Sequence, residues 1–132
     1  MVFGTSASTQ RKFRALIADD DPVIQKIHKV LLNKLGFETQ VVVNGKEAVD
    51  LFRSGAFFNL VLMDMEMPIM DGPQATRELR AMGVKTMIVG VTSRALESEK
   101  QAFMGAGLDD CHVKPLSAEI ITSLLKKLGK NK

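Results

Sequence analysis

Four short apolar runs in the chain each end on a side chain that can bind or accept a phosphoryl group. The residues that follow these runs are Asp19 and Asp20, Asp64, Thr92 and Lys114. If the runs are neighbouring strands of a parallel sheet, their carboxyl ends lie at one edge and bring these residues into one pocket. An acid pair, a lone acid, a hydroxyl and an ammonium group are the parts of a site that receives phosphate on a carboxylate.

The three acids indicate a divalent metal. Crowded carboxylates repel one another by about 1 to 4 kcal/mol per pair near a protein surface, unless a cation binds or their pKa values rise. Magnesium takes a few oxygen ligands together with water and phosphate oxygens. We therefore expect Asp20 and Asp64 to bind Mg²⁺ or Mn²⁺ directly, and Asp19 to hold a metal-bound water.

Asp64 is the expected nucleophile, because it stands at the tip of its strand. Its carboxylate would attack phosphorus in line and become an aspartyl phosphate. The metal and Lys114 would neutralise the equatorial oxygens, and Thr92 would donate a hydrogen bond to one of them.

Most of these residues also have a purely structural explanation. Asp21, before Pro22, is expected to cap a helix, Thr92 could cap one as well, and Lys114 could extend its ammonium group to solvent. Asp64 has no such explanation, because a carboxylate that follows an apolar strand is costly to bury without a partner. The joint occurrence of all these residues at strand ends favours a phosphoryl site.

The elements that must position these residues alternate between strands and helices. The periodicity predicts strands over residues 14–19, 37–43, 60–63, 86–91 and 110–113 and helices over residues 22–35, 47–52, 72–80, 96–106 and 118–128. In the first helix, an apolar face of Val23, Ile27, Val30, Leu31 and Leu35 is expected to be buried, and His28 is expected to face solvent.

Five strand and helix repeats with short connections require right-handed crossovers and a parallel sheet that is covered on both faces. We expect an α/β fold: a flavodoxin-like, doubly wound, five-stranded parallel sheet of strand order 2-1-3-4-5 with five helices. One domain over residues 13–129 is expected, with a disordered N-terminal tail over residues 1–12 and a short C-terminal tail over residues 130–132.

Composition excludes several classes of protein. No stretch approaches the length of a membrane span, and the single cysteine excludes a disulfide framework. The net charge of +3 comes from basic ends, because residues 15–119 hold eleven basic and fifteen acidic residues, a net charge of −4. Without Trp or Tyr to stack on bases, the chain is not expected to bind nucleic acid.

Four motifs carry a resemblance to a known family. They are LIADDDP at residues 16–22, LMDMEMPIMDG at 62–72, VTS at 91–93 and KP at 114–115. Over residues 14–128 the chain resembles the response-regulator receiver domain of two-component phosphorelays. The resemblance implies that Asp64 is the phosphoacceptor, that Asp19 and Asp20 bind metal, and that Glu66 offers a backbone carbonyl to it. It also implies a switch hydroxyl on Thr92 and a phosphate-sensing ammonium group on Lys114.

The same resemblance implies partners and a cellular role. Receivers take the phosphoryl group from phosphohistidine on a histidine kinase or a histidine phosphotransfer protein, and such partners dock along the first helix, where His28 would be a rim contact. Residues 87–93 and 102–116 are similar to the stand-alone plant receivers called type C. This implies a monomer of the cytoplasm and nucleus in plant cytokinin signalling that phosphorylates and dephosphorylates itself. It further implies a phosphate sink, with phosphohistidine phosphatase activity toward a phosphotransfer protein.

Two departures from the family pattern concern the readout and the lifetime of the phosphoryl group. Receivers commonly have Tyr or Phe three residues before the lysine, and this chain has Cys111, so the usual aromatic readout is in doubt. Glu66 lies two residues after Asp64, and Arg94 lies two residues after Thr92. We hypothesise that they pair across the pocket and restrict the attacking water.

Two alternatives come from other classes of protein. A small phosphatase of the haloacid dehalogenase type also uses a strand-end aspartate, but it needs a second aspartate where this chain has Glu66. A receiver-like module that binds partners without phosphorylation is the other alternative, although such modules usually lack the acids that this chain retains.

Overall fold

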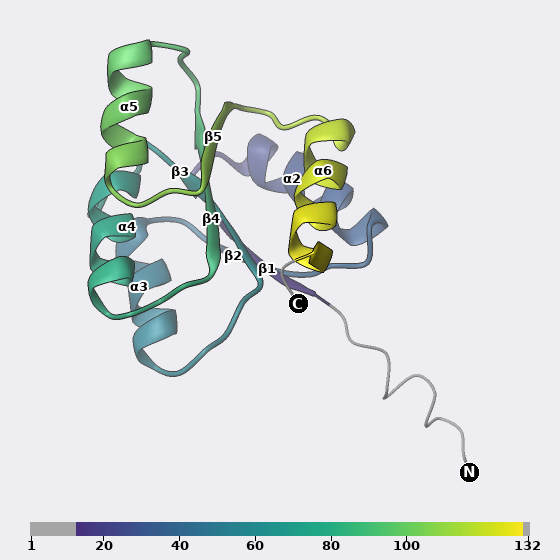
Figure 1. Cartoon of the computed structure of the whole chain (residues 1–132), viewed down its shortest axis with the longest axis horizontal. Coiled ribbons are helices and arrows are strands. Elements are labelled where there is room, and N and C mark those ends of the chain that lie inside the picture. Colours follow the sequence, from purple (N-terminus) through teal and green to yellow (C-terminus); the bar gives the residue numbers. More distant parts are fainter. Residues whose placement is uncertain (1–12, 131–132) are drawn as a thin grey trace.

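The computed structural model describes residues 13–130, in which five strands and five helices alternate along the chain (Figure 1). The strands are β1 (Arg14–Ala18), β2 (Glu38–Val42), β3 (Leu60–Asp64), β4 (Met87–Thr92) and β5 (Asp110–Val113). The helices are α2 (Pro22–Lys34), α3 (Gly45–Arg53), α4 (Gly72–Ala81), α5 (Glu97–Gly105) and α6 (Ala118–Lys130). The expected N-terminal tail lies outside the described residues, as do residues 131 and 132 of the C-terminal one.

The strands form one parallel sheet of order β2-β1-β3-β4-β5, so the predicted α/β fold and strand order are confirmed. Side chains alternate between its two faces. In β1, for example, Leu16 and Ala18 belong to one buried core, whereas Ala15 and Ile17 belong to the other. Both faces are apolar because both are covered, as expected of a parallel sheet.

The helices divide between the two faces of the sheet (Figure 1). Helices α3, α4 and α5 lie on one side, over the core that contains Val49, Leu79 and Phe103. Helices α2 and α6 lie on the other side, over the core that contains Leu32 and Ile121. Among the described residues, no helix combines the length and the apolar character that crossing a bilayer requires.

The orientation of α2 corrects the sequence prediction. Its buried residues are Ile24, His28 and Leu32, spaced four apart along the inner face of the helix. Val23 and Val30, which were predicted to be buried, are 65% and 44% exposed. The helix carries apolar side chains around much of its circumference, so hydrophobicity alone does not tell which stripe faces the sheet. The prediction that His28 faces solvent was likewise wrong.

The ends of the elements differ from the predicted ends by one or two residues, for reasons that lie in capping and pairing. Helix α3 begins at Gly45 rather than at residue 47, because the side chain of Asn44 accepts the Glu47 N–H and caps the helix there. Strands β3 and β4 reach Asp64 and Thr92. Asp64 and Thr92 are therefore the last residues of their strands.

Candidate functional site

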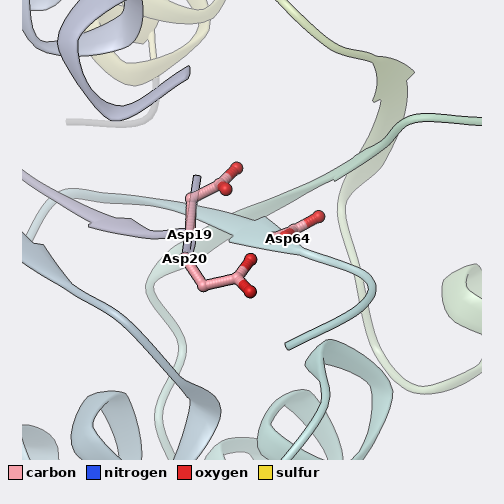
Figure 2. A group of neighbouring side chains, drawn as sticks. All are labelled: Asp19, Asp20 and Asp64. Atoms are coloured by element: carbon pink, nitrogen blue, oxygen red, sulfur yellow. The ribbon is translucent and has the colours of Figure 1, made fainter. Parts of the chain in front are cut away.

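Three carboxylates meet where β1 and β3 end (Figure 2). Asp19 and Asp20 follow β1 directly, and Asp64 is the last residue of β3. One carboxylate oxygen from each lies within 4.8 Å of the other two. Residues 44 positions or more apart in the chain thus converge because neighbouring parallel strands end at one edge.

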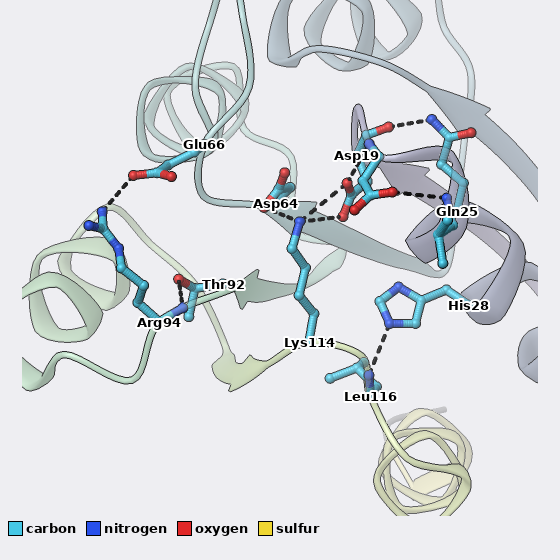
Figure 3. Close-up of polar contacts among 11 residues, drawn as sticks. Asp19, Gln25, His28, Asp64, Glu66, Thr92, Arg94, Lys114 and Leu116 are labelled. Atoms are coloured by element: carbon cyan, nitrogen blue, oxygen red, sulfur yellow. Dashed lines mark hydrogen bonds and ion pairs between the residues drawn. The ribbon is translucent and has the colours of Figure 1, made fainter.

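Lys114 reaches this cluster from the end of β5. Its Nζ lies 3.1 Å from Asp64 Oδ1 and 3.2 and 3.3 Å from the two carboxylate oxygens of Asp19 (Figure 3). The side chain is only 11% exposed, and the Lys114 N–H donates to the Thr92 carbonyl at 2.8 Å. The lysine therefore points into the site and not to solvent.

The site is short of positive charge. Burial and the charge of Asp19 raise the pKa of Asp64 to about 6, although the hydrogen bond and charge of Lys114 act to lower it. Burial alone would lower the pKa of Lys114, but its hydrogen bond to Asp64 and the charges of Asp64 and Asp19 raise it. One ammonium group faces three carboxylates, so the arrangement is suited to a further cation.

The two neighbouring acids occupy different positions. Asp20 is exposed and, like Asp64, lines a cleft of about 660 Å³. Asp19 lies behind them and is 1% exposed. Its Oδ1 accepts the Asp21 N–H at 3.0 Å, and its backbone carbonyl accepts a hydrogen bond from Gln25 Nε2 at 2.6 Å. Asp20 and Asp64 thus present oxygens to the cleft, while Asp19 is held in place by its neighbours.

Thr92 lines the cleft from the end of β4, and Arg94 lies two residues after it. Thr92 is the buried last residue of β4 and lines the cleft, and its Oγ1 accepts the Arg94 N–H at 3.2 Å. The Arg94 guanidinium bridges two acids, at 2.6 Å to Glu66 and 3.2 Å to Glu99. The expected pair of Glu66 and Arg94 is therefore present, and it ties the loop after β3 to α5.

Gly72 allows the loop after β3 to return close to Asp64. Its N–H donates to the Met65 carbonyl at 3.0 Å. A Cβ at this position would overlap the carbonyl oxygen of Asp64 and approach the ring of Phe103 to 2.9 Å. Only glycine fits this close approach of two backbone segments.

Cys111 and His112 point to opposite faces of the sheet, as predicted. Cys111 is buried in the core under α3, α4 and α5, and burial raises the pKa of its thiol. The His112 ring instead lies 3.0 Å from Asp110. Cys111 also borders a small cavity of about 230 Å³ beside Thr92 and Arg94. Cys111 thus shares the lining of this cavity with Thr92, and the His112 ring is paired with Asp110.

Sequence reasoning missed the parts of the site that α2 and α5 supply. His28 is fully buried, and its Nε2 accepts the Leu116 N–H at 3.0 Å. Gln25 and Glu99 were not singled out either, although they hold Asp19 and Arg94. A signal for His28 was available, because it lies four residues from an isoleucine and four from a leucine and so shares a helical face with them.

Comparisons with known proteins agree with this geometry. The family model of the response regulator receiver domain matches residues 15–126. Two-component response regulator 24 of Arabidopsis thaliana is 54% identical over 120 residues, which cover 91% of the chain and 86% of that protein. Two-component response regulator ORR42 of Oryza sativa subsp. japonica is 44% identical over 133 residues, which cover 100% of the chain and 96% of that protein.

A solved structure gives the same fold. It is the receiver domain of sensor histidine kinase PA1611 from Pseudomonas aeruginosa PAO1, described with a magnesium ion coordinated in its active site cleft. It is 30% identical, covers 90% of this chain and 99% of that chain, and superposes with a TM-score of 0.81. The receiver model matches most of the chain, and plant response regulators are among its relatives, so the chain belongs to the family of response regulator receiver domains.

Proposed function

We propose that the protein accepts a phosphoryl group on Asp64 in a His-to-Asp phosphorelay. The observation that carries the proposal is the cluster itself: a buried strand-end carboxylate, two further carboxylates within 4.8 Å and an ammonium group at 3.1 Å. The donor is phosphohistidine on a histidine phosphotransfer protein or a histidine kinase. Membership of the receiver family supports this donor.

The transfer assigns a role to each residue around the cleft. An oxygen of the ionised Asp64 attacks phosphorus, the bond from phosphorus to the imidazole nitrogen breaks, and its electron pair leaves with the imidazole. Lys114 neutralises a phosphoryl oxygen, and Thr92 donates its hydroxyl proton in a hydrogen bond to another. Both side chains line the same cleft as Asp64, which supports these roles.

The acids fit the requirements of a magnesium ion. They offer only oxygen ligands, and they carry more negative charge than Lys114 balances. Asp20, Asp64 and the backbone carbonyl of Glu66 would hold Mg²⁺ or Mn²⁺, with Asp19 holding a bound water. When bound, the ion supplies positive charge to the phosphoryl oxygens.

The outer face of α2 supports a protein as the donor. Pro22 follows Asp20 and Asp21 at the rim of the cleft, and an apolar strip continues from it along the helix. In this strip Val23 and Val30 are exposed, and Ile27 and Leu31 are half-buried. An exposed apolar surface next to a reactive pocket is typical of a protein-binding site. A phosphohistidine-bearing protein docked there would bring its imidazole to Asp64.

The geometry disfavours the phosphatase alternative. That chemistry needs a free acid two residues after the nucleophile, whereas Glu66 is held at 2.6 Å by Arg94. We infer instead that the protein is a stand-alone phosphate sink or signalling regulator in plant cytokinin signalling. We further infer that it is a monomer and acts in the cytoplasm and the nucleus. Plant relatives and Cys111 in place of an aromatic readout residue support this proposal.

The test is transfer from a radiolabelled, phosphorylated histidine phosphotransfer protein to the wild type and to Asp64→Asn, followed over time with Mg²⁺. Loss of label from the donor with stable label on Asp64 indicates a conventional receiver, and loss with release of inorganic phosphate indicates a sink. The binding module would be favoured if the wild type took no label from the donor and gained no phosphoryl mass, by mass spectrometry, after treatment with acetyl phosphate. Turnover of small phosphoesters would favour the phosphatase.

A further inference from the structure

The most unusual polar group of the core is the imidazole of His28, on the inner face of α2. It is fully buried, and its Nε2 accepts the backbone N–H of Leu116 at 3.0 Å (Figure 3). A ring nitrogen that accepts a hydrogen bond carries no proton, so the neutral ring has its proton on Nδ1. Nδ1 has no partner within the described part of the chain.

An apolar side chain would be the simpler choice at this position. The other buried residues of α2 are Ile24 and Leu32, and burying an imidazole with one unpartnered nitrogen is unfavourable. A leucine would avoid that penalty but would leave the Leu116 N–H without an acceptor. The specific contribution of His28 is therefore its hydrogen bond to the backbone of a segment 88 residues away.

That segment carries Lys114. Leu116 is buried two residues after the lysine, in the connection between β5 and α6. One turn before His28, Gln25 of the same helix holds the backbone carbonyl of Asp19 at 2.6 Å. Helix α2 thus fixes both sides of the ion pair of Lys114 and Asp19, and Figure 3 shows the imidazole lying beside the lysine stem.

We propose that His28 is a positioning residue, which holds the segment of Lys114 against α2 so that the ammonium group stays between Asp19 and Asp64. The role rests on the proposed function, because it acts on phosphoryl transfer only through Lys114. It makes α2 the element that aligns the lysine with the acceptor carboxylate.

The test compares His28→Leu, which removes the acceptor at similar volume, with His28→Gln, whose side-chain oxygen can accept the same N–H. Phosphorylation of Asp64 by acetyl phosphate and Mg²⁺ is expected to slow about tenfold in His28→Leu and to return toward the wild-type rate in His28→Gln. In a Lys114→Met background, His28→Leu should not slow phosphorylation further, because both changes remove the same interaction of Lys114 with the acceptor site. Leu32→Val, on the same inner face, should lower the unfolding temperature without slowing phosphorylation.

Amide hydrogen exchange tests the hydrogen bond between His28 and Leu116 independently of phosphorylation. Exchange at Leu116 should accelerate in His28→Leu and be slow again in His28→Gln. Unchanged exchange, equal phosphorylation of His28→Leu and wild type, or losses that multiply with Lys114→Met would each overturn the positioning role. If the wild type itself takes up no phosphoryl group, the proposed function fails, whereas the exchange result still decides whether His28 holds the segment.

Discussion

At the scale of single residues, Asp64 makes the metal-free protein less stable as the pH rises. Its pKa is 3.8 in an unfolded chain and about 6 in the folded protein, because of burial and the charge of Asp19. Between these values the folded state binds more protons than the unfolded state, so stability falls as pH increases through this window. The loss is complete only well above pH 6, where Asp64 is ionised in both states, and it amounts to at most about 3 kcal/mol.

We therefore expect Asp64→Asn to be more stable than the wild type at pH 8 in a metal chelator, and the gain to shrink as the pH is lowered toward 4. Denaturant unfolding at several pH values measures this difference. Asp50→Asn, which removes an exposed surface charge on α3, is the control and should show little such trend. A gain that is equal at pH 8 and pH 5 would contradict the raised pKa.

A second residue-scale prediction concerns Arg94, whose guanidinium joins Glu66 to Glu99 beside the cleft. Removing either side of the pair with Glu66 should admit water to the phosphorylated site more easily. We expect Arg94→Ala and Glu66→Ala to shorten the half-life of the aspartyl phosphate, measured after removal of the donor. Arg77→Ala, an exposed arginine of α4, should leave it unchanged. Decay at the wild-type rate in both site variants would remove the hypothesis.

The sequence reveals some residues of the site and conceals others for a physical reason. Asp64, Thr92 and Lys114 each follow an apolar run, so their type and position were visible in the sequence. His28 was assigned to solvent although its spacing places it on one helical face with Ile24 and Leu32. Its partner is a backbone N–H 88 residues away, and backbone partners leave no mark in a sequence.

At the scale of elements, the loop between β3 and α4 depends on Gly72, because a Cβ there would overlap the Asp64 carbonyl oxygen. Gly72→Ala must displace backbone and should destabilise the protein by about 1 to 3 kcal/mol. The matched control is Gly105→Ala at the end of α5, where an added Cβ meets nothing within 4 Å. That variant should be neutral or more stable by up to about 1 kcal/mol. Thermal unfolding of both variants tests this, and equal effects would contradict it.

Element boundaries and helix orientation were predicted with different success. Caps are local, so Asp21 and Asn44 could be identified from their neighbours, and both accept an N–H of the first turn. The rotation of α2 about its axis depends on what packs against it, and the helix has apolar side chains on two stripes. Of the stripe that was expected in the core, Leu31 and Leu35 do pack against it, whereas Val23 and Val30 are exposed. The proposed function assigns this exposed part to partner docking.

At the scale of the whole molecule, topology was the most predictable property. Short connections between successive strands and helices leave few arrangements with right-handed crossovers, and the observed strand order 2-1-3-4-5 is one of them. The same constraint places the ends of β1, β3, β4 and β5 around one cleft. The site therefore exists only in the folded chain, and its parts separate when the sheet unfolds.

This dependence on the fold makes metal binding measurable as global stability. A ligand that binds only the folded state stabilises it by about 2.7 kcal/mol when present at a hundred times its dissociation constant. We expect Mg²⁺ to raise the unfolding temperature of the wild type at pH 8, because it relieves the repulsion among Asp19, Asp20 and Asp64. Asp20→Asn, which removes one carboxylate from the cleft, should require more Mg²⁺ for the same rise, whereas Asp50→Asn should follow the wild type. If Mg²⁺ stabilised all three proteins equally, it would be acting on general surface charge and not on this cluster.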